Sequence, residues 1–275
     1  MKPAFQILPD KLPADPMPLA ETRLQHAWDE QIQPNPNAMV LATVNAAGQP
    51  SARVVLCKEI VPMPGYVVFY TNYRSHKGRE ITANPRAAVV FHWDALRRQL
   101  RIEGTVTRRP GSESDDYFAS RPWQSRIGAW ASAQSEPAGS RSHLQEELRA
   151  TARRFGAPDP TLPDSEDPGQ ERVVPRPPHC GGYRLWADAV EFWVEGDFRI
   201  HDRARYARSL TAGGLDHFHA GAWRHEARAE SVVDRVDEAH RIAVLVDHAE
   251  IDRVAVFRTP EGGEVAQRAL QVDHA

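Results

Sequence analysis

Basic residues recur at strand ends and helix starts, where they could bind an anionic group. In the segment YTNYRSHKGRE, Ser75 can cap a helix whose first turn contains His76, Lys77 and Gly78. The free backbone N–H groups, the positive end of the helix and the lysine charge could together bind a phosphate. The alternative is an ordinary capped helix with a solvated lysine.

Two further segments gather cationic side chains. Arg53 and Lys58 lie at the two ends of SARVVLCKE, and their odd spacing puts them on opposite faces of a regular strand. Arg199, His201 and Arg203 alternate in FRIHDRARY and therefore share one face of an extended chain. A surface stripe paired with acidic residues would also fit this pattern. Because several such signals occur in one chain, we predict a ligand with more than one anionic group.

The segment Ser120–Ser135, SRPWQSRIGAWASAQS, combines Trp123 and Trp130 with small hydrogen-bonding residues. Large aromatic and small polar side chains together are typical of a pocket wall. The segment lacks a wide apolar stripe, and on its own it is more simply interpreted as an irregular loop anchored by two tryptophans. Trp130 and Trp193 favour a flat ligand, and a phosphorylated flavin or a phosphorylated pyridine would fit.

Composition limits the classes of partner and the compartment. The chain has 275 residues and a formal net charge of −3, so neither nucleic acid nor an anionic membrane is the expected partner. Its two cysteines, Cys57 and Cys180, form no CxxC motif and fit a reducing cytosol, with Cys57 inside a strand as a core residue. The first residues lack the apolar run of a signal peptide, and apolar runs such as IAVLV are far shorter than the roughly 20 residues that span a bilayer. We therefore expect a cytoplasmic protein.

The hydrophobic pattern predicts an antiparallel β-structure with few helices. A proline-rich arm over residues 1–20 precedes a helix in LAETRLQHAWDEQI, where Leu24 and Trp28 share a face. Five strands follow in AMVLATVNAAGQPSARVVLCKEIV, GYVVFYTN, RAAVVFHWD and RQLRIEGTVTRR, with one short helix in SHKGREITANP. Strands spaced this closely pair antiparallel, since parallel pairing needs a long crossover. The pattern predicts a small antiparallel barrel or sandwich.

The second half of the chain adds helices, a long loop and more strands. Ser112 or Ser114 could cap a helix in SESDDYFASRP, and SHLQEELRATARRFG is a clear amphipathic helix that ends at Gly156. A proline-rich acidic loop precedes strands in GGYRLWADAVEFWVEGDFRIHDRARYAR. The tail could form strands in RIAVLVDH, RVAVFRT and EVAQRALQV, the last two joined by PEGG as a hairpin.

Several long segments resemble the pyridoxamine 5'-phosphate oxidase family in residue type, order and spacing. They are RVVLCK, FYTNYRSHKGREITANPRAAVVFHW, RQLRIEGTV, DDYFASRPWQSRIGAWASAQS, VPRPPHCGGYRL and EFWVEGDFRIHDRARY. The resemblance covers about Asn37 to Trp223. It implies an α+β fold dominated by β, an antiparallel FMN-binding split β-barrel with flanking helices. It also implies a homodimer that binds FMN at the subunit interface. We accordingly divide the chain into an amino-terminal arm and helix, 1–36, an oxidase domain, 37–224, and an atypical tail, 225–275.

The resemblance also implies a set of site residues. The implied FMN ligands are Arg53, Lys58, Tyr70, Thr71, His76, Lys77, Gln99, Gln134, Ser135, Trp193 and Arg203. The implied contacts to a substrate phosphate are Lys58, Tyr117, Arg121 and Ser125. Arg199 and His201 are the implied catalytic residues and would lie over the substrate ring. No metal is expected, although His217, His219 and His225 lie close together in DHFHAGAWRHE; their spacing matches no metal motif.

The chain departs from the family pattern in three places. His76 stands where the family usually has arginine, and the basic, tyrosine-containing amino-terminal segment that can cover substrate is not recognisable. The family usually ends with a tryptophan followed shortly by Arg-Leu-x-Pro, whereas this chain continues through AWRHEARAE into the tail. The tail could be an added hairpin or sequence translated after a frame change.

The function implied is oxidation of pyridoxamine 5'-phosphate, pyridoxine 5'-phosphate or both to pyridoxal 5'-phosphate, with O2 reduced to H2O2. The flavin would supply the redox chemistry, and the protein would supply position and electrostatics. Three alternatives stay open: an oxidase of another reduced ring, as in phenazine formation; a non-catalytic FMN or pyridoxal-phosphate binding protein; and a split-barrel protein that uses heme or a deazaflavin.

Overall fold

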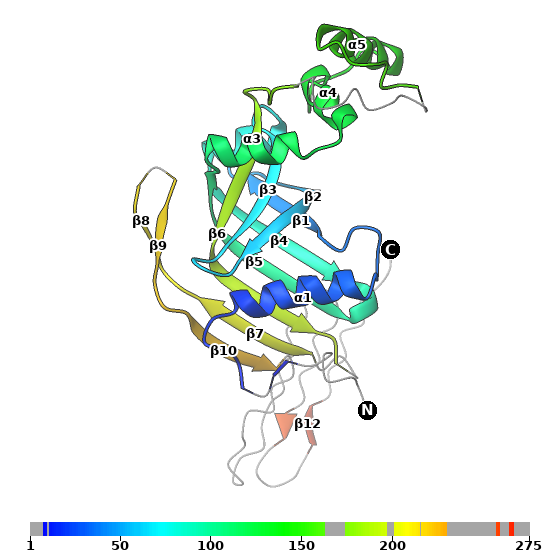
Figure 1. Ribbon diagram of the computed structural model, residues 1–275. Coiled ribbons are helices and arrows are strands. Elements are labelled where there is room, and N and C mark those ends of the chain that lie inside the picture. Colours follow the sequence, from blue (N-terminus) through cyan, green and yellow to red (C-terminus); the bar gives the residue numbers. More distant parts are fainter. Residues whose placement is uncertain are drawn as a thin grey trace.

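Alternating apolar residues over residues 38–108 and 180–194 build a closed antiparallel barrel. The computed structural model describes residues 8–9, 11–162, 174–196, 201–214, 216–229, 257–258 and 264–266. The barrel strands are β1 (Ala38–Val44), β2 (Pro50–Val61), β3 (Tyr66–Asn72), β4 (Arg86–Trp93), β5 (Arg98–Arg108) and β6 (Cys180–Val194). They follow the order β6-β3-β2-β1-β4-β5, and β5 pairs with β6 again to close the ring. This confirms the predicted antiparallel barrel (Figure 1).

The inner faces of these strands form the main hydrophobic core. Burial alternates along β5, where Leu100 and Ile102 are fully buried, as expected for a strand with one face toward a core. Phe69, Phe91 and Phe192 extend the same cluster from three other strands. The core therefore fills the barrel interior and leaves ligand sites at its ends and on its outer wall.

The long strand β6 changes partner along its length, and this opens one end of the barrel. Residues 180–186 pair with β3, whereas residues 189–194 pair with β7 (Asp202–Ala207). β10 (Arg224–Ala229) then pairs with β7 and widens this part of the sheet. A separate hairpin of β8 (Leu210–Ala212) and β9 (Phe218–Ala220) projects from the side of the barrel (Figure 1).

Helix α1 (Met17–Asp29) packs on the barrel wall with a different face from the one predicted. Its buried apolar residues are Met17, Ala20 and Ala27, whereas Trp28 is 44% exposed. The small alanine side chains allow the helix to lie close to the strands, and this orientation turns Trp28 toward solvent. The helix also begins and ends earlier than predicted, because Pro16 stands at its start.

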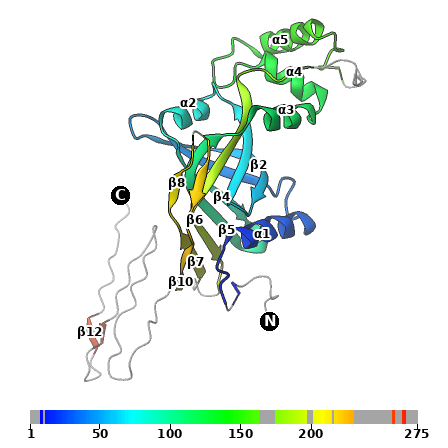
Figure 2. The ribbon, with the colours of Figure 1, turned by 60° about the vertical axis from the view of Figure 1, so that its left-hand side comes forward.

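Helix α2 (His76–Ala83) forms where it was predicted, between β3 and β4. Its N-cap is Ser75, whose side chain accepts a hydrogen bond from the Gly78 N–H, as expected. In the view of Figure 2, α2 and α3 lie near the same end of the barrel, away from α1. A 3₁₀ turn, Asp94–Leu96, joins β4 to β5.

Three helices form a lobe above this end of the barrel (Figures 1 and 2). They are α3 (Gly111–Ala119), α4 (Trp123–Ala131) and α5 (Arg141–Arg154). Their second core contains Phe118, Trp123, Ile127, Ala152 and Val174. As predicted, α5 is amphipathic and is followed by Gly156, which has a φ of +64°.

Two predictions for this lobe were wrong. The segment that was interpreted as an irregular loop contains helix α4, because Trp123 and Ile127, four residues apart, are both buried in the second core. Neither Ser112 nor Ser114 caps α3, whose N-cap position is Pro110. Ser114 instead lies within the helix and accepts a hydrogen bond from the Gly182 N–H at 3.2 Å.

Little of the chain beyond residue 229 is described. β11 (Phe257–Arg258) and β12 (Glu264–Ala266) pair antiparallel on either side of PEGG. The strand predicted in RIAVLVDH and most of the amino-terminal arm lie outside the described residues. None of the helices in the described ranges has the length and apolar character needed to cross a membrane. The cytoplasmic location stays a prediction.

The closure of the barrel generates a test at Gly104. A Cβ there would lie 1.8 Å from the Trp186 carbonyl oxygen, since β5 has a register shift between Glu103 and Gly104 and approaches β6 closely. We expect Gly104→Ala to lower the free energy of unfolding by about 3 kcal/mol through overpacking, as measured by urea denaturation. Gly139→Ala is the control because no atom lies within 4 Å of its added Cβ. Equal unfolding midpoints for the two variants would contradict this close packing.

Candidate active site

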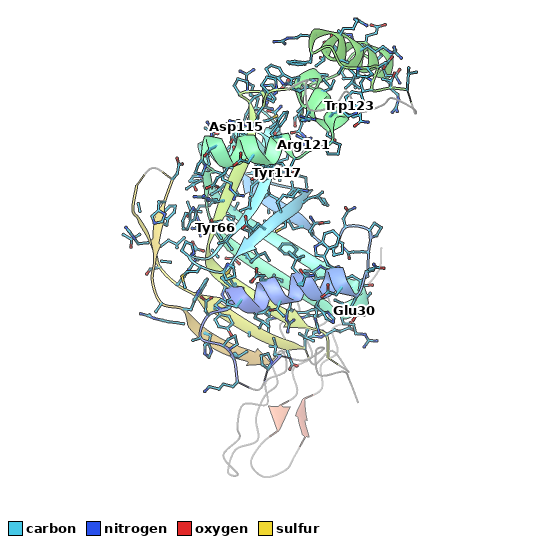
Figure 3. The ribbon with its side chains drawn as sticks, viewed as in Figure 1. Glu30, Tyr66, Asp115, Tyr117, Arg121 and Trp123 are labelled. Atoms are coloured by element: carbon cyan, nitrogen blue, oxygen red, sulfur yellow. The ribbon has the colours of Figure 1, made fainter. Side chains whose placement is uncertain are left out.

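A cavity of about 390 Å³ lies between the end of β3, the start of β6 and helices α3 and α4. Six of the residues predicted for the site line it: Tyr70, Thr71, Tyr117, Arg121, Ser125 and Gln134. Figure 3 shows Tyr117 between α3 and the barrel, with Arg121 at the end of the same helix. The segment Ser120–Ser135 is thus part of a pocket wall, as one of the two sequence interpretations proposed.

Two tyrosines form an aromatic wall inside this cavity. The rings of Tyr70 and Tyr117 are stacked, with centroids 3.6 Å apart and planes inclined by 15°. The ammonium group of Lys58 lies 5.7 Å from the centroid of Tyr117. A register shift between Cys57 and Glu59 interrupts β2 at Lys58, so the regular alternation expected between Arg53 and Lys58 does not hold. The cavity combines a flat aromatic surface with a nearby cation.

Arg121 adds a second positive charge to the cavity. Its guanidinium carbon lies 5.5 Å from the centroid of Phe118, which holds the side chain against α3. Across the described ranges, no carboxylate forms an ion pair with Arg121. A guanidinium that lines a cavity without an acidic partner favours an anionic ligand, and phosphate suits its fork of donors.

Lys77 is a third cationic side chain at this end of the barrel. It adjoins the cavity because it contacts Thr71 and Gln134, which line the cavity. Its side chain is buried, with 9% exposed, and its ammonium donates to Thr71 Oγ1 at 3.1 Å and to Ser75 Oγ and Gln134 Oε1 at 3.3 Å. All three acceptors are neutral. Desolvation, and secondly the charge of Arg53, lower the pKa of Lys77. A buried ammonium with only neutral partners is stabilised by an anion at the capped start of α2.

Arg53, by contrast, already has an acidic partner. Its Nη2 lies 3.1 Å from Oε2 of Glu80, which is 3% exposed and also accepts hydrogen bonds from Thr43 and Ser51. Burial raises the pKa of Glu80, but these hydrogen bonds from Thr43, Ser51 and Arg53 outweigh it and hold the pKa below its usual value of 4.5. His76 is 56% exposed and its Nε2 lies 3.3 Å from Oε1 of the same carboxylate. Among the residues that the structure describes, Lys77 is therefore the cation of this group that has no carboxylate partner.

Three more of the predicted site residues lie at the other end of β6. Gln99, Trp193 and Arg203 are register neighbours on β5, β6 and β7 and form one row across the sheet. Trp193 lies eleven positions along β6 from Gly182, which pairs with Tyr70, so the row lies on the order of 30 Å from the cavity. Within one chain, the structure does not bring this row and the cavity together.

His201 extends the row, whereas Arg199 lies outside the described residues. The imidazole centroid of His201 is 4.7 Å from the Trp193 ring, and its Nδ1 accepts a hydrogen bond from the Gly196 N–H at 3.1 Å. This contact favours the tautomer that has its proton on Nε2. Ser135 follows Gln134 with a φ of +70°, a left-handed conformation uncommon for serine.

Sequence reasoning missed several residues around the cavity. Arg176 lines it and binds Asp115 through Nε at 2.7 Å. Arg109 and Glu113 lie behind Tyr70. Glu113 and Tyr117 are four residues apart on α3 and therefore share a helix face, a signal that could have identified Glu113.

Two candidates from the sequence do not contribute to this cavity. Trp130 lies in the wall of a neighbouring cavity of about 780 Å³ and donates from Nε1 to the Pro175 carbonyl at 2.7 Å. The rings of His217 and His219 are 5.4 Å apart. Over the residues that the structure describes, no group of three histidine, cysteine or acidic side chains could hold a metal ion.

The closed antiparallel barrel, with its cationic cavity at one end, places the chain in the class of split-barrel proteins. Pyridoxamine 5'-phosphate oxidase is the family whose profile matches residues 24–157, and the profile of the pyridoxine 5'-phosphate oxidase C-terminal dimerisation region matches residues 181–229. The chain belongs to the pyridoxamine 5'-phosphate oxidase family and is an oxidase, which confirms the resemblance of the sequence motifs.

Individual relatives support this assignment. The chain is 48% identical over 189 residues to the pyridoxine/pyridoxamine 5'-phosphate oxidase of Paraburkholderia phytofirmans, covering 69% of this chain and 80% of that protein. It is 51% identical over 173 residues to the enzyme of the same name from Rubrobacter xylanophilus, covering 63% and 72%. Among solved structures, PhzG from Burkholderia lata, in complex with tetrahydrophenazine-1-carboxylic acid, has a TM-score of 0.67 and 26% identity, covering 81% and 97%.

The charge balance around Glu80 generates a test. Since its folded pKa lies below the usual value, its ionised form stabilises the fold above about pH 4.5, and this contribution is lost as the pH falls through the folded pKa. We expect Glu80→Gln to cost about 1–3 kcal/mol of unfolding free energy at pH 7, because Arg53 loses its charged partner. The difference from wild type should shrink in acid, as measured by urea unfolding between about pH 7 and about pH 3. A constant difference across this range would contradict the assignment.

Proposed function

We propose that this chain is an FMN-dependent oxidase that forms pyridoxal 5'-phosphate from pyridoxamine 5'-phosphate, pyridoxine 5'-phosphate or both. The substrate carbon that carries the amine or alcohol loses one hydrogen as a hydride, the attached nitrogen or oxygen loses a proton, and O2 gains both as H2O2. With the amine, one water is also consumed and ammonia is released. The observation that carries this proposal is a pair of cations without a carboxylate partner among the described residues: Arg121 lines the aromatic cavity, and Lys77 adjoins it through Thr71 and Gln134.

Two separate cations suit two phosphate groups, one on a cofactor and one on a substrate. The FMN phosphate would be held by Lys77 at the capped start of α2, with Arg53 and His76 beside it. The buried ammonium of Lys77, which has only neutral partners, is the feature of this chain that fits such a group. When bound, FMN supplies a two-electron acceptor between the substrate and O2.

The substrate phosphate would be bound by Arg121, Ser125, Tyr117 and Lys58. Arg121 and Ser125 lie on either side of the start of α4, where Pro122 and Trp123 fix the chain. The stacked ring of Tyr117 limits the width of the cavity, and this favours a flat heteroaromatic ring. These side chains would bind and orient the substrate and exclude water from the reacting carbon.

Two subunits are needed to complete this site. Gln99, Trp193 and Arg203 cannot reach a ligand in the cavity of their own chain, so we propose that they contact the flavin bound by a second subunit. His201, beside Trp193, and Arg199 would then approach the substrate ring from that subunit. The match of residues 181–229 to a dimerisation region supports this arrangement, because the row lies within it.

A second candidate is oxidation of a reduced phenazine ring. The structural likeness to PhzG, which was solved with tetrahydrophenazine-1-carboxylic acid, favours this possibility. Arg121 in the cavity and Lys58 beside Tyr117 favour a phosphate-bearing substrate over a larger tricyclic one. The relatives at 48–51% identity carry the name pyridoxine/pyridoxamine 5'-phosphate oxidase.

The proposed function is tested by flavin binding and peroxide formation. We expect purified protein to retain FMN, and FMN at about 100 times its Kd to raise the unfolding free energy by about 2.7 kcal/mol. H2O2 should form with pyridoxine 5'-phosphate or pyridoxamine 5'-phosphate and not with tetrahydrophenazine-1-carboxylic acid. Lys77→Met should weaken FMN binding roughly 10- to 100-fold, whereas Arg121→Met should retain FMN and raise the KM for the phosphorylated substrate by a similar factor.

Arg86→Met is the control for these two variants, since Arg86 is exposed and pairs with Asp188 outside the cavity. Loss of FMN from both Lys77→Met and Arg121→Met would contradict the assignment of separate phosphate groups. Flavin retention without peroxide formation from either phosphorylated substrate would contradict the proposed reaction.

The shared site is tested by mixing two inactive variants. Lys77→Met removes the cation that we propose binds the FMN phosphate. Arg203→Met removes a guanidinium from the row of Gln99, Trp193 and Arg203. We therefore expect each homodimer to have little activity. After subunit exchange, half of the dimers are mixed, and one of their two sites is intact. Activity should therefore recover to about a quarter of wild type. No recovery in a sample that contains mixed dimers, detected by native mass spectrometry, would contradict a site built from two subunits.

A further inference from the structure

A network of charged side chains lies directly behind the aromatic wall of the cavity. Arg109, at the end of β5, donates from Nη1 to the Tyr70 hydroxyl at 3.0 Å. Tyr70 in turn stacks on Tyr117, which lies between α3 and the barrel in Figure 3. Arg109 is therefore linked through Tyr70 to Tyr117, which the proposed function assigns to substrate binding.

Acidic residues hold the Arg109 guanidinium in place. Its Nε donates to Glu113 on α3, and its Nη2 lies 3.4 Å from Glu59 on β2. Arg184 on β6 donates from Nη2 to both oxygens of Glu113 at 2.8 Å. Burial raises the pKa of Glu113, but the hydrogen bonds and charges of Arg109 and Arg184 outweigh it and lower that pKa. The charges in this network compensate one another, so Arg109 is not a free anion site.

Tyr70 is held at its hydroxyl as both acceptor and donor. It accepts from Arg109 and donates to the Glu113 carbonyl oxygen at 3.5 Å. Burial raises the pKa of Tyr70, with the charge of Arg109 opposing, so the hydroxyl keeps its proton at neutral pH and can make both contacts. Because a phenol donates and accepts mainly in the plane of its ring, these two hydrogen bonds restrain rotation of the Tyr70 ring about its long axis. The restrained ring supports the stack with Tyr117.

A glycine on β6 makes room for this arrangement. A Cβ at Gly182 would lie 2.8 Å from Tyr70 Cε1 and 3.1 Å from Arg109 Cβ. The Gly182 carbonyl accepts from the Arg109 N–H at 2.9 Å, and its N–H donates to Ser114 on α3. The backbone of β6 thus brings Tyr70, Arg109 and α3 together.

We propose that Arg109 is a positioning residue, which fixes the Tyr70 ring and through it the Tyr117 side chain that binds the phosphorylated substrate. This inference rests on the proposed function, since it assigns to Arg109 an effect on substrate affinity. Arg109 does not line the cavity. Its hydrogen bond to a cavity-lining side chain goes to the hydroxyl of Tyr70, so we expect its effect to fall on KM rather than on the reacting carbon.

The test compares Arg109→Met with Arg184→Met in the FMN-loaded dimer. Both variants remove a guanidinium from Glu113, but only Arg109 contacts the Tyr70 hydroxyl. We expect Arg109→Met to raise the KM for pyridoxine 5'-phosphate about tenfold and to change kcat about twofold at most, and Arg184→Met to leave KM within about twofold. Arg109→Lys, which keeps the charge but cannot form the same fork, should fall between Arg109→Met and wild type.

A double-mutant cycle with Tyr70→Phe isolates the contact. Tyr70→Phe removes the hydroxyl that accepts the hydrogen bond from Arg109. The variant with both substitutions should therefore have a KM no higher than that of Arg109→Met alone. Additive effects would overturn the proposal, as would an unchanged KM in Arg109→Met or an equal rise in Arg184→Met. If Arg109→Met does not fold, the comparison of Arg109→Lys with Arg184→Met decides, and no rise in KM for Arg109→Lys overturns the proposal.

A measurement that does not depend on turnover keeps this proposal separate from the proposed function. In protein labelled with ¹³C-tyrosine, stacked rings shift each other's signals, and single tyrosine-to-phenylalanine variants assign them. We expect Arg109→Met to reduce the mutual shift of Tyr70 and Tyr117, and Arg184→Met to preserve it; an unchanged shift in both overturns the positioning role. A wild-type dimer that oxidises neither phosphorylated substrate would overturn the proposed function and the effect on KM, while the ring signals would still decide the contact.

Discussion

The length of β6 is the constraint on which the proposed site depends. One end of this strand pairs with β3 beside the cavity, and the other pairs with β7 beside the row of Gln99, Trp193 and Arg203. An extended strand cannot shorten, so these two groups stay on the order of 30 Å apart in one chain. A ligand that contacts both groups must therefore lie between two copies of the protein, and the match to a dimerisation region at β6 and beyond agrees with this requirement.

Charge compensation then distinguishes the cations that stabilise the fold through a carboxylate from the cations that an anionic ligand would stabilise. Arg53, Arg109 and Arg184 each contact a carboxylate at the same end of the barrel. Lys77 and Arg121 have none among the residues described, although one is buried and the other lines the cavity. Because a desolvated cation is costly without a counter-charge, these two side chains are the ones that an anionic ligand would stabilise. This contrast is the physical basis for our proposal of two phosphate positions rather than one diffuse basic patch.

The sequence predicted the parts of the fold that local patterning controls. Alternation and close spacing identified the five strands between Ala38 and Arg108, and the Ser75 cap followed from the residue types at the start of α2. The orientation of α1 was wrong because packing against the barrel, rather than the Leu24 and Trp28 spacing, decides which face is buried. Helix α4 was missed because its buried residues pack on α5 and Val174, which lie far along the chain.

The candidate site was predictable in composition but not in arrangement. Family motifs placed Tyr70, Tyr117, Arg121 and Lys77 in the site before any geometry was available. They did not reveal that Glu80 neutralises Arg53, that a bulge displaces Lys58, or that Arg109 supports Tyr70, since each depends on contacts between strands distant in sequence. The separation between the cavity and Trp193 likewise required the register of β6.

A crystal structure of the dimer with FMN and pyridoxal 5'-phosphate tests the central claim most directly. The account predicts that the FMN phosphate lies within hydrogen-bond distance of Lys77 of one subunit, while its ring contacts Trp193 of the other. The pyridoxal phosphate group should lie beside Arg121. An FMN whose contacts all come from one chain, or one bound away from Lys77, would contradict the account.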